Sequence, residues 1–125
     1  MGLQTARAET ILRVLAEGEW ISAAVVPEAT AWQEVRWIVG VQAGRQLYFA
    51  PYQFDERNRP RPVIREILSE LGPVTDPWEI ASWFHFPNGW IVEADGGRPI
   101  APKDALDNRV GSLEAARRFR KTYVA

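Results

Sequence analysis

The amino-acid sequence predicts a mainly α fold, a compact helical domain that carries one small β-hairpin. Three observations support this class. Apolar residues recur at helical spacing in several segments, a well-marked helix start occurs at Asp76, and an alternating β pattern is confined to residues 39–49. The chain has 125 residues and a 46% apolar fraction, which suffices for one domain with a hydrophobic core.

The N-terminal third is expected to contain three helices. Residues 3–17 place apolar side chains on one face at helical spacing, and Gly18 ends this first helix. Residues 20–26 favour a short helix capped by Ser22, although their β-branched content leaves a strand as the alternative. A third helix is expected from a cap at Thr30 to about residue 39.

A β-hairpin follows the third helix. Residues 39–41 and 46–49 are expected to form its strands, with Ala43-Gly44 in the turn. Short helices followed by a hairpin are the layout of a helix-turn-helix with a wing, which binds DNA. The other interpretation is the N-terminal half of a helical core that carries a small hairpin. The sequence leaves both interpretations open.

Two helices are well marked in the second half of the chain. From about Arg61 to Leu71 the apolar residues form one stripe, and Gly72-Pro73 ends the helix. The segment Asp76-Pro77-Trp78-Glu79 then provides an N-cap carboxylate, a proline at the first helical position and an acid at the third. This second helix is expected to run to about Phe84 or His85.

Weaker signals complete the chain. Residues 103–106 indicate a brief helical piece after a Gly-rich turn at residues 96–99. The last helix is expected to be capped by Ser112 and to run to about Tyr123. Its apolar residues would face the core and its arginines would face solvent.

The residue types argue against catalysis. The chain has no cysteine, which excludes disulfides, thiolate chemistry and the common zinc sites. Its single histidine, His85, lies between two phenylalanines near a helix end, where a structural role is the more frequent one. No phosphate-binding loop, dinucleotide fingerprint or nucleophile elbow occurs. We therefore predict no catalytic residues, no metal ligands and no cofactor.

Charge and hydropathy restrict the location and the partners. The formal net charge of −1 at pH 7 does not favour indiscriminate coating of nucleic acid. The N-terminus lacks the apolar core of a signal peptide, and no apolar run approaches the length of a membrane span. We expect a cytoplasmic protein that makes no membrane contact.

A DNA-binding role would depend on the third helix and the hairpin. Gln33 and Arg36 on the helix and Arg45 in the hairpin are the residues placed to contact DNA. Against this, Glu28 and Glu34 would repel the phosphate backbone, and a solvent-exposed helix face explains the same residues. The alternative function is a stand-alone DNA-binding transcriptional regulator of winged-helix type.

A series of motifs in the remainder of the chain points to protein binding. In order, the motifs are Tyr48-Phe49-Ala50-Pro51-Tyr52-Gln53-Phe54-Asp55, Arg59-Pro60, Pro62-Val63-Ile64, Asp76-Pro77-Trp78-Glu79-Ile80-Ala81-Ser82-Trp83-Phe84, Pro87-Asn88, Gly97-Arg98-Pro99, Asp104-Ala105-Leu106, and Val110 followed by Ala115-Ala116-Arg117. Over about residues 47–119 this order resembles the toxin-binding domain of the antitoxin Xre/MbcA/ParS family. Two features depart from the family. Residues 90–95 intervene before Gly96-Gly97 where the family usually has a short Leu-Gly-Gly turn, and Ala101-Pro102 differ from the usual spacing before Asp104.

The resemblance implies an antitoxin that binds and neutralises a cognate RES-type toxin, an NAD-degrading enzyme, by covering its active site. It implies two parts: a helical region over residues 1–46, a candidate degenerate winged helix or helix-turn-helix, and a toxin-binding domain over residues 47–125. A homodimer or a hetero-oligomer with the toxin would be the working form, and operator DNA would be a second partner for autoregulation.

The resemblance also separates core residues from anchor residues. Trp83 and Phe84 are expected in the core of the toxin-binding domain. Interfaces are rich in Trp and Arg side chains, which supply large contact area and multiple donors. The residues expected to contact the toxin are Trp90, Arg98, Arg117, Arg118 and Arg120.

Overall fold

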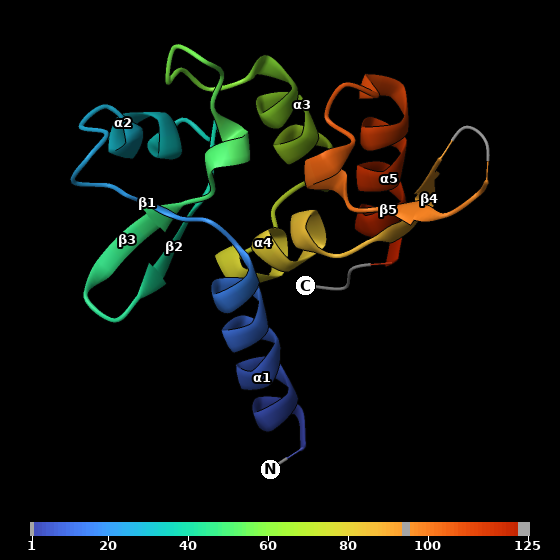
Figure 1. Ribbon diagram of the computed structural model, residues 1–125, viewed down its shortest axis with the longest axis horizontal. Helices are drawn as coiled ribbons and strands as arrows, with labels where there is room; N and C mark the ends of the chain where they lie inside the picture. Colours follow the sequence, from blue (N-terminus) through green and yellow to red (C-terminus); the bar gives the residue numbers. More distant parts are fainter. Residues whose placement is uncertain (1, 94–95, 123–125) are drawn as a thin grey trace.

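The computed structural model describes residues 2–93 and 96–122 of the chain. Within them the fold is mixed α/β with helices dominant, because small antiparallel sheets accompany the helices (Figure 1). No helix in this part of the chain is long and apolar enough to cross a membrane. The elements are α1 (Gly2–Glu17), β1 (Ile21–Ser22), α2 (Ala29–Glu34), β2 (Gly40–Ala43), β3 (Gln46–Phe49), η1 (Pro51–Gln53), α3 (Pro62–Leu71), α4 (Pro77–His85), β4 (Asn88–Val92), β5 (Pro99–Ile100), η2 (Pro102–Asp104) and α5 (Arg109–Thr122).

The predicted hairpin is confirmed, but the expectation of a single β element is incomplete. Strands β2 and β3 form the hairpin, and β1 adds to it on the other edge of β3, giving the antiparallel order β1-β3-β2. A second sheet pairs β4 with β5. Strands β1 and β5 have two residues each, which is too short for an alternating pattern to appear in the sequence.

Two expectations for the N-terminal third are wrong. Residues 20–26 do not form a helix capped by Ser22, because the N–H of Ala23 donates to Leu47 of β3 and the Ser22 hydroxyl instead accepts from Ala24 in a turn. The third helix, α2, ends at Glu34 rather than near residue 39, because Arg36 adopts a left-handed backbone with φ of 62°. A helix-turn-helix is not confirmed.

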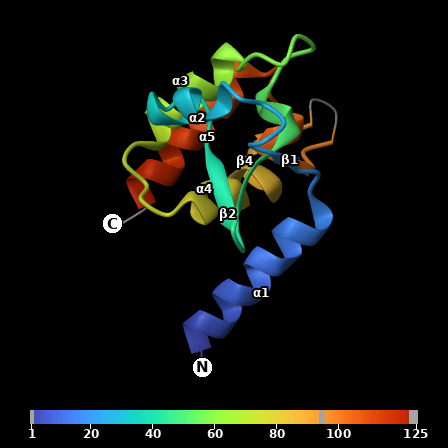
Figure 2. The ribbon, with the colours of Figure 1, turned by 90° about the vertical axis from the view of Figure 1, so that its left-hand side faces the viewer.

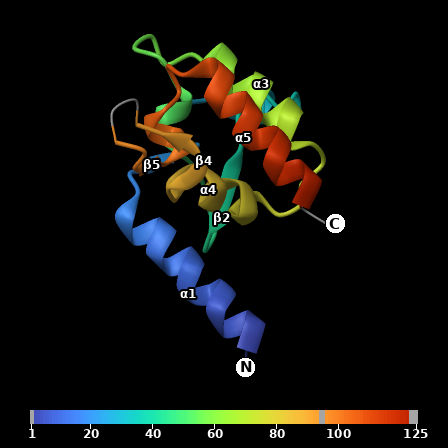
Figure 3. The same cartoon turned by 90° about the vertical axis from the view of Figure 1, so that its right-hand side faces the viewer.

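Helices α3 and α4 agree with the sequence. In α3 the stripe of buried residues consists of Ile64, Ile67, Leu68 and Leu71. At the start of α4 the Asp76 carboxylate accepts a hydrogen bond from the N–H of Trp78 at 3.0 Å, as expected of an N-cap. Helix α5 packs along α3, and the β4–β5 hairpin lies beside α5 (Figure 3).

The predicted cap of the last helix is wrong. Helix α5 begins at Arg109, and the Asn108 side chain accepts from the N–H of Gly111 at 3.0 Å. Ser112 lies inside the helix, fully buried, and its hydroxyl donates to the carbonyl of Ala105 at 2.8 Å. The predicted end at Tyr123 lies outside the described residues.

One hydrophobic core joins the two parts that the sequence was divided into. The same cluster contains Val26 and Phe49 from the N-terminal elements and Ile64 and Leu113 from α3 and α5. The proposed boundary at residue 46 falls on the first residue of β3. Figure 2 shows β2 running beside α4, which brings the N-terminal sheet against the C-terminal helices.

A buried glutamine links the two parts. Gln53 is 1% exposed, and its side chain accepts from the N–H of Val39 at 2.8 Å and donates to the carbonyl of the same residue at 2.9 Å. The side chain of Gln33 accepts from the next N–H, that of Gly40, at 2.8 Å. These contacts satisfy the backbone groups of Val39, just before β2, and the N–H of Gly40 on β2, which is an edge strand of its sheet.

Replacing Gln53 by Leu keeps the side-chain volume but leaves both polar groups of Val39 without their partner. Each unsatisfied buried group costs about 1–3 kcal/mol, so we expect a loss of about 2 kcal/mol or more in the free energy of unfolding. Urea denaturation measures it. The matched control Gln46→Leu, at an exposed position of β3, should stay within about 0.5 kcal/mol of wild type. Equal effects of the two substitutions would contradict this role of Gln53.

Candidate partner-binding face

Strand β4 presents an exposed tryptophan. Successive residues of a strand point to opposite faces, and here Ile91 is fully buried while its neighbour Trp90 is 57% exposed. The N–H of Trp90 donates to the Asn88 side chain at 2.8 Å, which fixes the backbone at the start of the strand. A large indole is therefore held on the surface by a strand whose other face is in the core.

An arginine of α5 covers the ring of Trp90. The guanidinium carbon of Arg118 lies 4.5 Å from the ring centroid, in cation–π geometry. The same guanidinium donates to the Glu114 carboxylate, one turn earlier in α5, at 2.9 Å. Two residues predicted to contact a partner, 28 positions apart in sequence, thus meet on one face.

Two further arginines predicted to contact the partner lie between α5 and α3. Arg117 forms ion pairs with Glu70 of α3 at 3.2 Å and with Glu114 at 3.5 Å. Arg120 covers Gly72, where a Cβ would lie 2.9 Å from the arginine Nε and where φ is 78°. Both arginines remain exposed to solvent, but their contacts hold α5 against α3.

Arg98, the last of the five predicted residues, precedes β5 in the hairpin. Its carbonyl accepts from the N–H of Glu93 at 3.0 Å. Its side chain is exposed and makes no hydrogen bond or ion pair with the described residues. The structure therefore does not place Arg98 in contact with the other four.

A groove of about 370 Å³ separates the hairpin from α5. We call it the hairpin–α5 groove; it is lined by Trp83, Asn88, Gly89, Trp90, Ala115, Arg118, Phe119, Lys121 and Thr122. Three of its lining residues are aromatic (Trp83, Trp90 and Phe119) and two are cationic (Arg118 and Lys121). Surfaces of this composition suit binding to another protein, because they combine apolar area with charge.

The three residues considered for DNA binding do not form one surface. Gln33 holds the N–H of Gly40, and Arg36 donates to the carbonyl of Gly72, with burial lowering the pKa of its guanidinium. Both line a cavity beside the start of α4. Arg45 lies apart, exposed in the turn between β2 and β3.

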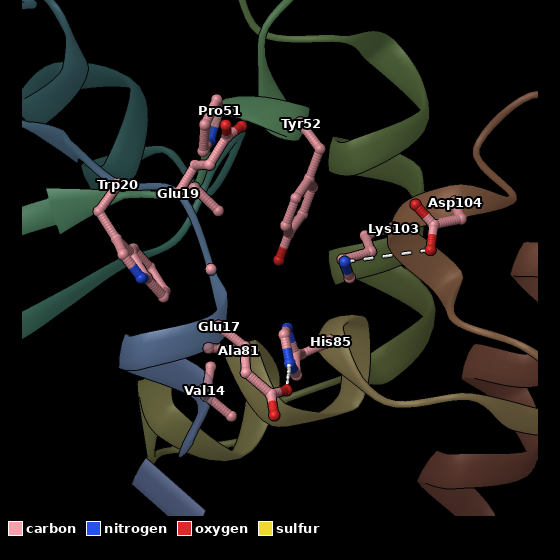
Figure 4. A pocket seen from close by; sticks show the side chains of 12 residues that line it. Val14, Glu17, Glu19, Trp20, Pro51, Tyr52, Ala81, His85, Lys103 and Asp104 are labelled. Carbon is pink, nitrogen blue, oxygen red and sulfur yellow. Dashed lines mark hydrogen bonds and ion pairs between the residues drawn. The ribbon is translucent and has the colours of Figure 1, made fainter. Parts of the chain in front are cut away.

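A second cavity, of about 550 Å³, lies between α1, η1, α4 and η2 (Figure 4). His85 and Glu17 meet on one side of it, with 2.7 Å between Nε2 and Oε1. The Tyr52 ring points into the cavity from η1, and Lys103 faces it from η2. The hydrogen bonds from His85 and then Arg13 lower the pKa of the Glu17 carboxylate, and burial raises the pKa of Tyr52.

The sequence assigned no role to Glu17 or Lys103. Glu17 and His85 are 68 positions apart, so only the packing of α1 on α4 brings them together. His85 itself was expected to be structural, and here it attaches α1 to α4. The sequence motifs contain five residues of this cavity, namely Ala50, Pro51, Tyr52, Ala81 and Asp104. Among the described residues no group of three or more His, Cys, Asp or Glu side chains could hold a metal ion.

Comparison with known proteins adds no relative to this picture. No protein-family model matches the chain, and neither the curated proteins nor the solved structures contain a significant match.

Replacing Glu17 by Gln tests the attachment of α1. Because the folded-state pKa of Glu17 is lowered, its ionised form stabilises the fold above the ordinary value of 4.5, and this stabilisation is lost as the pH falls through the lowered pKa. We expect the variant to unfold at lower urea than wild type near neutral pH, and the two to converge in acid. Glu19→Gln, an exposed carboxylate of the same cavity, is the control. A difference that persists unchanged into acid would contradict this assignment.

Proposed function

We propose that this protein is an antitoxin-like protein that binds a RES-type, NAD-degrading toxin through the hairpin–α5 groove and blocks its active site. The order of motifs that resembles the toxin-binding domain of the Xre/MbcA/ParS family supports the class of partner. The observation that carries the proposal is the exposed indole of Trp90, held in place on β4 and covered by Arg118 of α5.

The exposed indole of Trp90 makes this face suited to binding. A Trp side chain has few rotatable bonds and a large apolar surface, so burying it against a partner gains much and orders little. The guanidinium of Arg118 lies over the ring of Trp90, and an ion pair between Arg117 and Glu70 joins α5 to α3. Neutralisation by occlusion then needs affinity alone and no catalytic group on this chain.

DNA binding is less well supported by the structure. Gln33 and Arg36 already hold backbone groups of their own chain, and α2 has six residues. Operator binding would have to release these contacts or rely on Arg45. We therefore propose that the principal partner is the cytoplasmic toxin rather than DNA, and that the two proteins form a hetero-oligomer.

The proposal predicts a complex with the RES-type toxin encoded beside this chain. Co-expression is expected to relieve the toxin's growth arrest and its depletion of NAD, and the two chains are expected to co-purify at a fixed ratio. A toxin that stays active and elutes alone in the presence of the folded chain would contradict the proposal.

The substitution Trp90→Ala tests the face itself. We expect the dissociation constant for the toxin to rise roughly thirtyfold, the effect of losing an interface residue worth about 2 kcal/mol. The free energy of unfolding should change by less than about 1 kcal/mol, because the ring is exposed in the free chain. Calorimetric titration and urea denaturation measure the two quantities.

Trp37 provides a matched control for Trp90. It is also partly exposed, at 36%, and the guanidinium of Arg65 lies over its ring at 5.3 Å. It stands outside the hairpin–α5 groove. Trp37→Ala should leave the affinity for the toxin unchanged, and equal losses from the two substitutions would place the interface elsewhere.

A further inference from the structure

One residue that lines the hairpin–α5 groove carries a buried donor without an acceptor. Trp83 lines the groove and is 8% exposed, and its indole Nε1 is buried with no hydrogen-bond partner. It is the one side-chain polar atom in this condition among the described residues. Buried indole N–H groups usually find an acceptor, so an unpaired one beside a groove calls for an acceptor from outside the chain.

The charges around the groove select the kind of acceptor. Arg118 and Lys121 both line the groove, and Lys121 makes no ion pair with the described residues. Glu114, the acidic residue nearest to Arg118 in α5, is shared between Arg117 and Arg118. A negatively charged oxygen acceptor would give the indole N–H of Trp83 a hydrogen-bond partner and would also pair with the cationic side chains of Arg118 and Lys121.

Arg118 lines the groove together with Trp83 and is held there only by surface contacts. The indole nitrogen has no exposed surface in the free chain, so an acceptor reaches it only after a groove side chain moves. Arg118 is held by one cation–π contact and one ion pair, both at the surface, where such contacts contribute little. Moving it from the Trp90 ring costs little and frees its guanidinium for a new carboxylate.

We propose that the hairpin–α5 groove receives an Asp or Glu side chain of the toxin, whose carboxylate accepts from Trp83 Nε1 and pairs with Arg118 and Lys121. The inference rests on the proposed function, since the toxin supplies the carboxylate. The contact adds a recognition rule for the toxin segment. The segment must carry Asp or Glu at one position, and Asn or Gln at that position is rejected because the negative charge and its pairing with the arginine and lysine are lost.

Nuclear magnetic resonance of the indole N–H groups tests the contact directly. The chain has six tryptophans, and the signal of Trp83 is assigned as the one missing from Trp83→Phe. On addition of the unlabelled toxin, we expect this signal to move downfield, as a donor does on bonding to a carboxylate, and the signal of Trp37 to stay in place. An unmoved Trp83 signal in a saturated complex would overturn the inference.

Affinities separate this inference from the proposed function. Trp83→Phe, Arg118→Gln and, on the toxin, the Asp→Asn or Glu→Gln change at the acidic position are each expected to weaken binding about tenfold to a hundredfold. Arg45→Ala is the matched control. Arg45 is exposed in the turn between β2 and β3 and does not line the groove, so this substitution should have no effect on the affinity. If Trp83→Phe does not fold, the Arg118 and toxin variants still decide the question.

Each outcome has one meaning. A complex whose affinity is unchanged in the groove variants and in every acidic-position variant of the toxin overturns the carboxylate contact and leaves the antitoxin function standing. Absence of any complex overturns both. A Trp83 signal that moves with the concentration of this chain alone would assign the groove to a second copy and overturn the proposal.

Discussion

The structure depends on two adjacent aromatic residues of α4 that are both buried. Trp83 and Phe84 project about 100° apart around the helix, so both are removed from water only if α4 is covered on two sides. On one side Phe84 meets Tyr52 of η1, with ring centroids 5.3 Å apart. On the other, Trp83 lies 6.5 Å from the ring of Phe119 in α5. Helix α4 is therefore in contact with η1 on one side and with α5 on the other.

The candidate binding face follows from that arrangement. Phe119 of α5 contacts Trp83, the β4–β5 hairpin that follows α4 lies beside α5, and Trp90 of β4 stays exposed. The ion pairs of Arg117 with α3 then keep the far side of α5 in place. The packing that buries the core residues therefore also forms the hairpin–α5 groove. The groove has an exposed indole, two cationic side chains and a residue with an unpaired buried donor.

Local signals predicted the elements that local chemistry decides. The Asp76 cap, the apolar stripe of α3 and the two strands of the β2–β3 hairpin needed neighbours in sequence only, although the turn is Gly44-Arg45 rather than Ala43-Gly44. Strand β1 pairs with β3 far along the chain, and β1 and β5 have two residues each, so no alternating pattern marks them in the sequence.

Side-chain roles were harder to predict than elements. Arg36 and Gln33 have the composition of a DNA-reading helix, yet tertiary contacts occupy both. Nothing in its type marked Gln53 as buried, or Trp83 as an indole without an acceptor.

The most direct test of the binding face is hydrogen–deuterium exchange of the chain, free and bound to the RES-type toxin. Slower exchange in β4–β5 and α5, with α2 and the β2–β3 hairpin unchanged, is the predicted result; protection confined to α2 and that hairpin would contradict it.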